Sequence, residues 1–159
     1  MKETASIEQV MLATKRFRAE GWCCTESVAM ALAEAQGLDT PLLPRLASAF
    51  CGGIGRTGST CGALSGAVMG ISLAFGRNHP QDSADNAHQA TQALIREFEK
   101  RFGSCLCNEL TGCHLDTPEG RQRFTQNELR ERCNRFCIEA AEIAQELILA
   151  PPALGSRAE

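Results

Sequence analysis

The spacing of glycines in the middle of the chain restricts the fold more than any other feature. Gly62, Gly66 and Gly70 recur every four residues within the segment 61–75. Residues four apart lie on one face of an α-helix, so these glycines form a stripe without side chains along which a second helix can approach closely. The segment therefore predicts a central, buried helix, packed either inside the monomer or across a homodimer.

A cysteine stands at the start of this helix. Ser59 and Thr60 are both good N-caps, which places Cys61 in the first turn, and Gly76 is suited to end the helix. The unpaired N–H groups of a first turn and the positive end of the helix dipole stabilise a thiolate. We therefore predict a lowered pKa for Cys61 and single it out as the candidate catalytic nucleophile and metal ligand.

Two other motifs overlap this glycine-rich stretch. G-x-x-x-G in the uncharged segment 57–76 is also a transmembrane dimerisation pattern, but its strongly apolar part is shorter than the roughly 20 residues that a span requires, so no membrane insertion is predicted. Gly53, Gly55 and Gly58 match the dinucleotide-binding pattern, which has meaning only after a strand, whereas the preceding residues look helical. An anion bound at the helix N-terminus beside Arg56 is left open.

Apolar residues at helical spacing predict the rest of the fold, and β-branched residues never alternate as a strand requires. Before the central helix, helices are expected at about residues 6–20 and 25–36 and over a short stretch that begins at Thr40. After it, they are expected from residue 82 or 83 to 102, at 104–112 and at 126–149, with a further turn of helix at Pro118. Residues 1–150 thus form one all-α domain, a single helical bundle of about five to seven helices. Pro151 and Pro152 end the last helix, and residues 151–159 are expected to be a flexible tail.

Charge and the first residues narrow the class of protein. The net charge is -3, and lysine and arginine are scattered along the chain, which argues against a nucleic-acid-binding protein. The first ten residues, MKETASIEQV, form an amphipathic helix start and not a signal peptide, so we expect a cytoplasmic protein.

Cysteine is unusually frequent, with nine residues in a chain of 159. In a reducing compartment an odd and large number of cysteines favours metal or redox chemistry over a disulfide framework. Four separate regions each bring a thiol to a helix start or an inward helix face: Cys23 and Cys24, Cys61, Cys105 and Cys107, and Cys133 and Cys137.

These cysteines stand in recognisable motifs. WCCTESV, GGIGRTGSTCGALSGAVMG, FGSCLCNEL and CNRFCIEAAEIAQEL resemble the C_GCAxxG_C_C family of redox-active proteins, which is named for its cysteine pattern. The resemblance runs from about residue 21 to 147, and the CGAxxG element is its most specific part. Matched residue by residue, the family cysteines fall on Cys24, Cys61, Cys107 and Cys133, and the neighbouring Cys23 and Cys105 are candidate substitutes.

The resemblance implies a helical redox protein that binds a metal or an iron–sulfur cluster for electron transfer or redox sensing. Four thiolates suit a [2Fe–2S] cluster, and the same residues would suit a structural zinc ion. A metal-free thiol oxidoreductase or sensor, in which Cys61 attacks and another cysteine resolves, is the alternative. The chain contains no C-x-x-C-H motif, so covalent c-type haem is not expected, and the redox partner is not identified.

The other cysteines and the histidines have simpler interpretations. Buried cysteine packs as a small hydrophobic residue, so Cys51 and Cys137 are predicted to fill the core, and Cys113 is interpreted as a loop thiol. His114, next to Cys113, is the one histidine considered as a ligand.

Overall fold

The computed structural model describes residues 4–126 and 128–153, and within these ranges it contains eight α-helices and no strand. They are α1 (Ile7–Glu20), α2 (Cys24–Ala35), α3 (Leu43–Ala47), α4 (Gly62–Phe75), α5 (Asp85–Phe102), α6 (Cys107–Thr111), α7 (Pro118–Gln126) and α8 (Leu129–Leu149), with the 3₁₀ turn η1 (Ser48–Phe50). The predicted all-α fold is confirmed. The helix count slightly exceeds the expected range because residues 118–126 form a complete helix.

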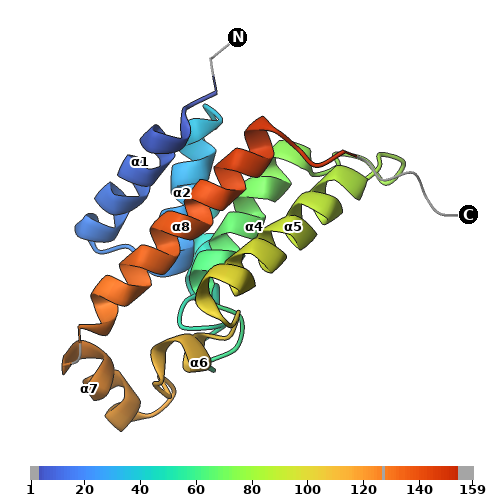
Figure 1. Ribbon diagram of the computed structural model, residues 1–159. Coiled ribbons are helices and arrows are strands. Elements are labelled where there is room, and N and C mark those ends of the chain that lie inside the picture. Colours follow the sequence, from blue (N-terminus) through green and yellow to red (C-terminus); the bar gives the residue numbers. More distant parts are fainter. Residues whose placement is uncertain (1–3, 127, 154–159) are drawn as a thin grey trace, which may run out of the picture.

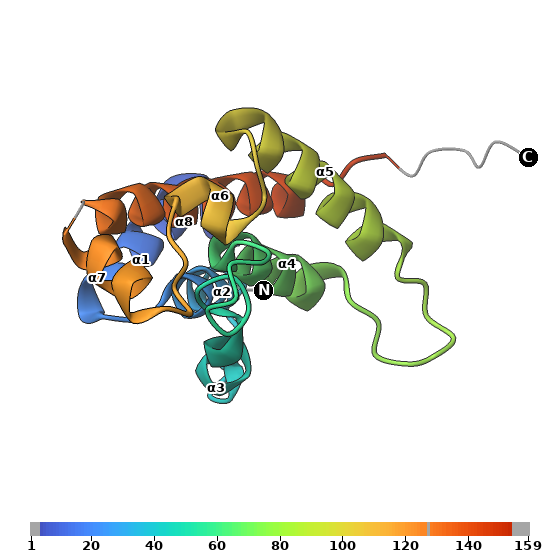
Figure 2. The same ribbon diagram turned by 90° about the horizontal axis from the view of Figure 1, so that it is seen from below.

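Five helices lie side by side and form the bundle. Figure 1 shows α1, α2, α8, α4 and α5 running in similar orientation, with α6 and α7 at the lower end. Seen from below, α3 projects away from this layer (Figure 2). Leu42, which precedes α3, and Leu46 within it are exposed, whereas Leu43 is buried. None of the helices in the described part of the chain combines the length and the apolar character needed to span a bilayer.

The glycine stripe of α4 packs against α2 within the same chain. A Cβ at Gly66 would lie 2.6 Å from the Thr25 carbonyl oxygen and 2.9 Å from the Val28 Cβ. At Gly70 it would overlap the side chain of Leu32. The two helix backbones therefore approach closely along the stripe, and of the two arrangements left open by the sequence, packing inside the monomer is the one observed.

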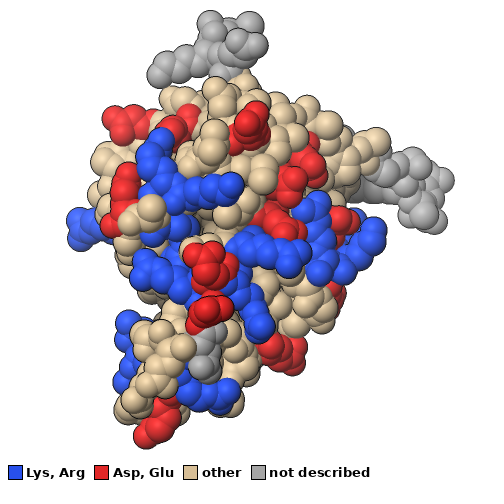
Figure 3. Space-filling model, turned by 60° about the vertical axis from the view of Figure 1, so that its left-hand side comes forward, with Lys and Arg blue, Asp and Glu red and all other residues tan. Residues whose placement is uncertain are grey.

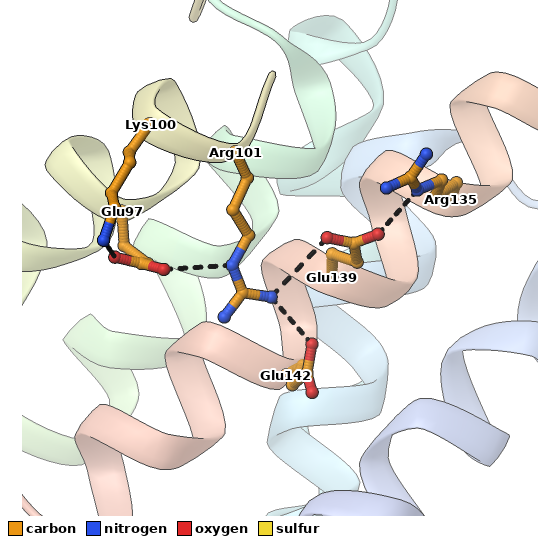
Figure 4. A network of polar contacts seen from close by, with 6 residues as sticks. All are labelled: Glu97, Lys100, Arg101, Arg135, Glu139 and Glu142. Atoms are coloured by element: carbon orange, nitrogen blue, oxygen red, sulfur yellow. Dashed lines mark hydrogen bonds and ion pairs between the residues drawn. The ribbon is translucent and has the colours of Figure 1, made fainter. Parts of the chain in front are cut away.

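Helix α5 is held against α8 by aromatic rings and by ion pairs. The Phe98, Phe102 and Phe136 rings pack on one another, with the Phe102 and Phe136 centroids 4.9 Å apart. On the surface, the Arg101 guanidinium lies 2.9 Å from Glu142 and 3.5 Å from Glu139 (Figure 4). Such partly exposed pairs contribute little individually, so the rings supply most of the attachment.

Helix boundaries near the cysteines differ from the prediction. Cys61 is itself the N-cap of α4, because Thr60 forms an isolated antiparallel bridge with Leu106. This bridge also delays α6 until Cys107, whereas the sequence suggested a start at Ser104. Residues 154–159 of the predicted tail, and Asn127 within the predicted last helix, lie outside the described residues.

The loop before α4 contains a left-handed turn. Residues 52–56 all have positive φ, between 61° and 72°, and two of them are not glycine: Ile54 (61°) and Arg56 (65°). Backbone hydrogen bonds close the turn, from the Gly55 N–H to Ala49 and from the Arg56 N–H to Cys51. Left-handed backbone costs a residue with a Cβ roughly 1–2 kcal/mol, and a β-branched residue is an outlier there.

Replacing Ile54 with asparagine should therefore stabilise the protein. Ile54 is 44% exposed, so its side chain is only partly buried, and asparagine tolerates positive φ. We expect the free energy of unfolding to rise by about 0.5–1 kcal/mol, measured by urea denaturation. Ile95→Asn is the control, since Ile95 is similarly exposed but lies in the interior of α5, where asparagine is disfavoured. Destabilisation of both variants alike would contradict the prediction.

Candidate metal and redox centre

A cavity of about 380 Å³ opens at the end of the bundle where α6 and α7 lie. It is bounded by the C-terminal end of α1, the start of α2, the left-handed turn, α6, α7 and the first turns of α8. Five cysteines line it: Cys23, Cys24, Cys51, Cys107 and Cys133. Four chain segments far apart in the sequence thus bring thiols to one cavity.

Three of the four family-matched cysteines lie on the cavity wall. Cys24 is the first residue of α2 and Cys107 the first residue of α6, while Cys133 lies one turn into α8. Helix starts carry unpaired N–H groups, so two of these sulfurs stand near partial positive charge.

Cys61 lies behind the wall and is only 6% exposed. A Cβ at the adjacent Gly62 would overlap the Cys24 Sγ, so the starts of α2 and α4 touch at the two cysteines. The Cys61 N–H donates to the Cys105 carbonyl at 2.8 Å, which ties the start of α4 to the segment before α6.

Burial governs the protonation of these thiols. It raises the pKa of Cys107 to about 11 and that of Cys133 to about 12, and in both cases the nearby Cys24 raises it further. The pKa of Cys61 is also raised, first by burial and then by Cys24, although the Ala63 and Leu64 amides act in the opposite direction. The lowered pKa expected for Cys61 is therefore wrong, because desolvation outweighs the helix N-terminus.

This arrangement predicts a pH dependence for the reduced, metal-free protein. The folded pKa values of Cys107 and Cys133 lie above the ordinary thiol value of 9.0, so the folded chain keeps protons that the unfolded chain releases. Stability is then fully present below pH 9 and falls as the pH rises toward 11 and 12. Between pH 9 and 10 each thiol should lower the free energy of unfolding by on the order of 1 kcal/mol, measured by urea denaturation. Cys133→Ala should show a shallower decline, and an unchanged slope would contradict the assignment.

The pairing of Cys23 with Cys51 was not predicted. The two form a disulfide that joins the start of α2 to the left-handed turn, with Cα atoms 6.2 Å apart. Their sulfurs and that of Cys24 all lie within 4.8 Å of one another. The interpretation of Cys51 as core packing is thus wrong, because the turn carries it to the cavity wall. Cys23, proposed as a substitute ligand, does lie on that wall.

The remaining candidates lie elsewhere. Cys105, proposed as a substitute for Cys107, is outside the cavity lining, with its sulfur 4.0 Å from the Ile95 carbonyl oxygen. Cys137 is fully buried in the core, as predicted. Cys113 lies in the loop after α6, as predicted, and is buried there, whereas His114 is exposed.

Arginines supply the charge of the cavity. Arg18, Arg56, Arg121 and Arg130 line it, and no carboxylate does among the residues that the structure describes. Figure 3, which brings the side of α1 forward, shows basic and acidic residues next to one another on that face. The Glu26 carboxylate, outside the lining, accepts from the Cys23 N–H at 2.8 Å. Positive charge on the lining beside several thiols suits negatively charged ligands, including thiolates that bind a metal.

Comparison with known proteins gives one match. The family model described as "Putative redox-active protein (C_GCAxxG_C_C)" matches residues 22–147, which include α2 and all the cysteines. Searches of curated proteins and of solved structures found no match.

Proposed function

We propose, since this chain belongs to the C_GCAxxG_C_C family of redox-active proteins, that Cys24, Cys61, Cys107 and Cys133 bind an iron–sulfur cluster for electron transfer or redox sensing. The observation that carries the proposal is that Cys24, Cys107 and Cys133 line one cavity. Cys61 lies behind its wall, where the start of α4 touches the Cys24 sulfur.

The chemistry of the donor set fits such a group. Iron–sulfur clusters are held by four thiolates, and a [2Fe–2S] cluster is the simplest that these residues could hold. Without a metal, clustered thiolates would repel one another, and burial penalises each charge. The arginines and helix starts around the cavity would offset the negative charge of a ligated cluster.

A bound cluster would supply a one-electron redox centre. The protein's part would be to hold four thiolates, to keep water away from Cys61, and to raise the potential through nearby positive charge. Zinc ligation by the same residues would instead give a structural site without electron transfer.

The second candidate function is metal-free thiol–disulfide chemistry. The Cys23–Cys51 disulfide on the cavity wall favours it. Cys61 does not suit the role of attacking thiol that the sequence suggested, because it is buried and its pKa is raised.

The test of the cluster is the absorption spectrum and metal content of protein purified without oxygen. Visible charge-transfer bands with stoichiometric iron and acid-labile sulfide would support the proposal. Colourless protein containing zinc would assign a structural site. Colourless, metal-free protein that also fails reconstitution with iron and sulfide would overturn both metal assignments and leave the thiol candidate.

A further inference from the structure

We propose that the cavity is a thiol–disulfide exchange site for a small thiol that carries carboxylates, and that the Cys23–Cys51 disulfide is the group that exchanges. The inference rests on the second candidate function and does not require a cluster. It is carried by three observations: a disulfide on the wall, a cavity of ligand size, and a lining in which the charged residues are all arginines.

The disulfide is within reach of a small molecule. Cys23 and Cys51 are both partly exposed, and both line the cavity, whose volume of about 380 Å³ suits a ligand of a few tens of atoms. Trp22, Leu115 and Phe124 also line it and would cover the apolar part of such a ligand. A buried structural disulfide would offer none of this access.

The arginines select the charge of the ligand. Arg18 is engaged, since it donates to Asn134 and to the Trp22 carbonyl, and Arg121 donates to the Leu115 carbonyl. Arg56 and Arg130 are exposed, and their guanidinium groups have no hydrogen bond or ion pair among the described residues. A carboxylate would accept hydrogen bonds from these free guanidinium groups, as the sequence suggested for an anion beside Arg56.

The exchange reaction requires no oxidant or reductant other than the protein disulfide and the substrate thiol. A substrate thiolate attacks the Cys51 Sγ, a substrate–Cys51 disulfide forms, the Cys23–Cys51 bond breaks, and its electron pair passes to the Cys23 sulfur. Cys23 is the N-cap of α2, where the helix N-terminus stabilises a departing thiolate. A second substrate thiolate then attacks the substrate sulfur of the mixed disulfide and releases Cys51. Two thiols become one small disulfide, and the protein disulfide becomes two thiols; the reverse reaction reduces the small disulfide.

The test compares small thiols of different charge on the full chain, as purified and again after metal removal. The rate of reduction of the Cys23–Cys51 disulfide is measured per thiolate with glutathione, which carries two carboxylates, and with cationic cysteamine. The same two rates are measured with 2-hydroxyethyl disulfide in place of the protein, and their ratio gives the intrinsic reactivity of glutathione relative to cysteamine. We expect the glutathione-to-cysteamine ratio to exceed that reference by about tenfold at low salt and to fall toward it at high salt.

Variants separate the cavity from general surface charge. The double variant Arg56→Gln/Arg130→Gln should lower the ratio several-fold, whereas Arg96→Gln, exposed on α5 and outside the cavity, should leave it unchanged. In Cys23→Ser, oxidised glutathione should leave an adduct that peptide mapping assigns to Cys51. A wild-type ratio equal to the reference, or one that the double variant does not change, would overturn the proposal. The assay measures reduction of the Cys23–Cys51 disulfide and not iron content. A negative result would therefore count against the exchange site and not against the iron–sulfur cluster.

Discussion

Replacing Cys24 with alanine should remove bound iron and the visible absorption of protein purified without oxygen. Cys24 lines the cavity with Cys107 and Cys133, and its sulfur touches the start of α4 beside Cys61, so its loss removes a central member of the proposed ligand set. With three thiolates left, we expect iron and acid-labile sulfide to fall at least tenfold, because loss of a ligand costs more than the 10–100-fold typical of an outer-shell partner.

Two control variants make this result specific. Cys105→Ala removes a thiol outside the cavity lining and should leave iron content near that of the unaltered protein. Cys137→Ser alters a fully buried cysteine beside the Cys24 carbonyl, so it should lower stability with little effect on the iron-to-protein ratio of the folded fraction. Equal loss of iron in Cys24→Ala and Cys105→Ala would argue against the assigned ligand set.

Replacing Gly66 with alanine should destabilise the fold by about 1–3 kcal/mol, the usual cost of forcing an extra methyl group into a packed core. The added Cβ would lie 2.6 Å from the Thr25 carbonyl oxygen and 3.2 Å from the Ala29 nitrogen. These are backbone atoms, so no change of rotamer can make room, and α2 and α4 must separate. An exposed helical glycine would behave oppositely, because alanine is the better helix former by up to about 1 kcal/mol. The sign of the change in the free energy of unfolding therefore shows whether Gly66 is packed against α2 or exposed.

The measurement is urea denaturation of the reduced protein, with Ser72→Ala as the matched control. Ser72 is an exposed residue of the same helix, so alanine there should be neutral or slightly stabilising. If Gly66→Ala stabilised the protein as Ser72→Ala does, the close approach of α2 and α4 would have to be abandoned. If Gly66→Ala also lowered iron content, the spacing of the helix starts would be tied to the site.

The helical fold could be predicted because its signals are local. The apolar stripes of α1, α5 and α8 and the glycines that follow α1 and α5 predict α1 and the C-terminal ends of α5 and α8, whereas α5 and α8 begin two or three residues later than expected. The glycine stripe likewise indicated close helix packing, although its partner α2 could not be named from spacing alone. At the starts of α4 and α6 the prediction differs from the structure by one or two residues, and the cause is the Thr60–Leu106 bridge, a contact between segments far apart in the sequence.

Less of the candidate site could be predicted. The motif resemblance selected Cys24, Cys107 and Cys133, which do line one cavity. It could not reveal Cys51, because that residue reaches the wall through a left-handed turn that includes Ile54, a residue type that disfavours this conformation. Nor could the sequence weigh burial against the helix dipole at Cys61, since burial depends on the packing of the whole bundle.

The glycine stripe also has a consequence for how the site responds to a change in charge. Where two helices meet through side chains, rotamers can adjust, and the helices can slide by fractions of an ångström at small cost. At Gly66 the opposing atoms are backbone or lie within one bond of it, so the separation of α2 from α4, one turn from Cys24 and Cys61, is set by the main chain itself. A centre held this way would relax little when it gains or loses an electron. Small relaxation keeps the reorganisation energy low, which is the property that fast electron exchange requires.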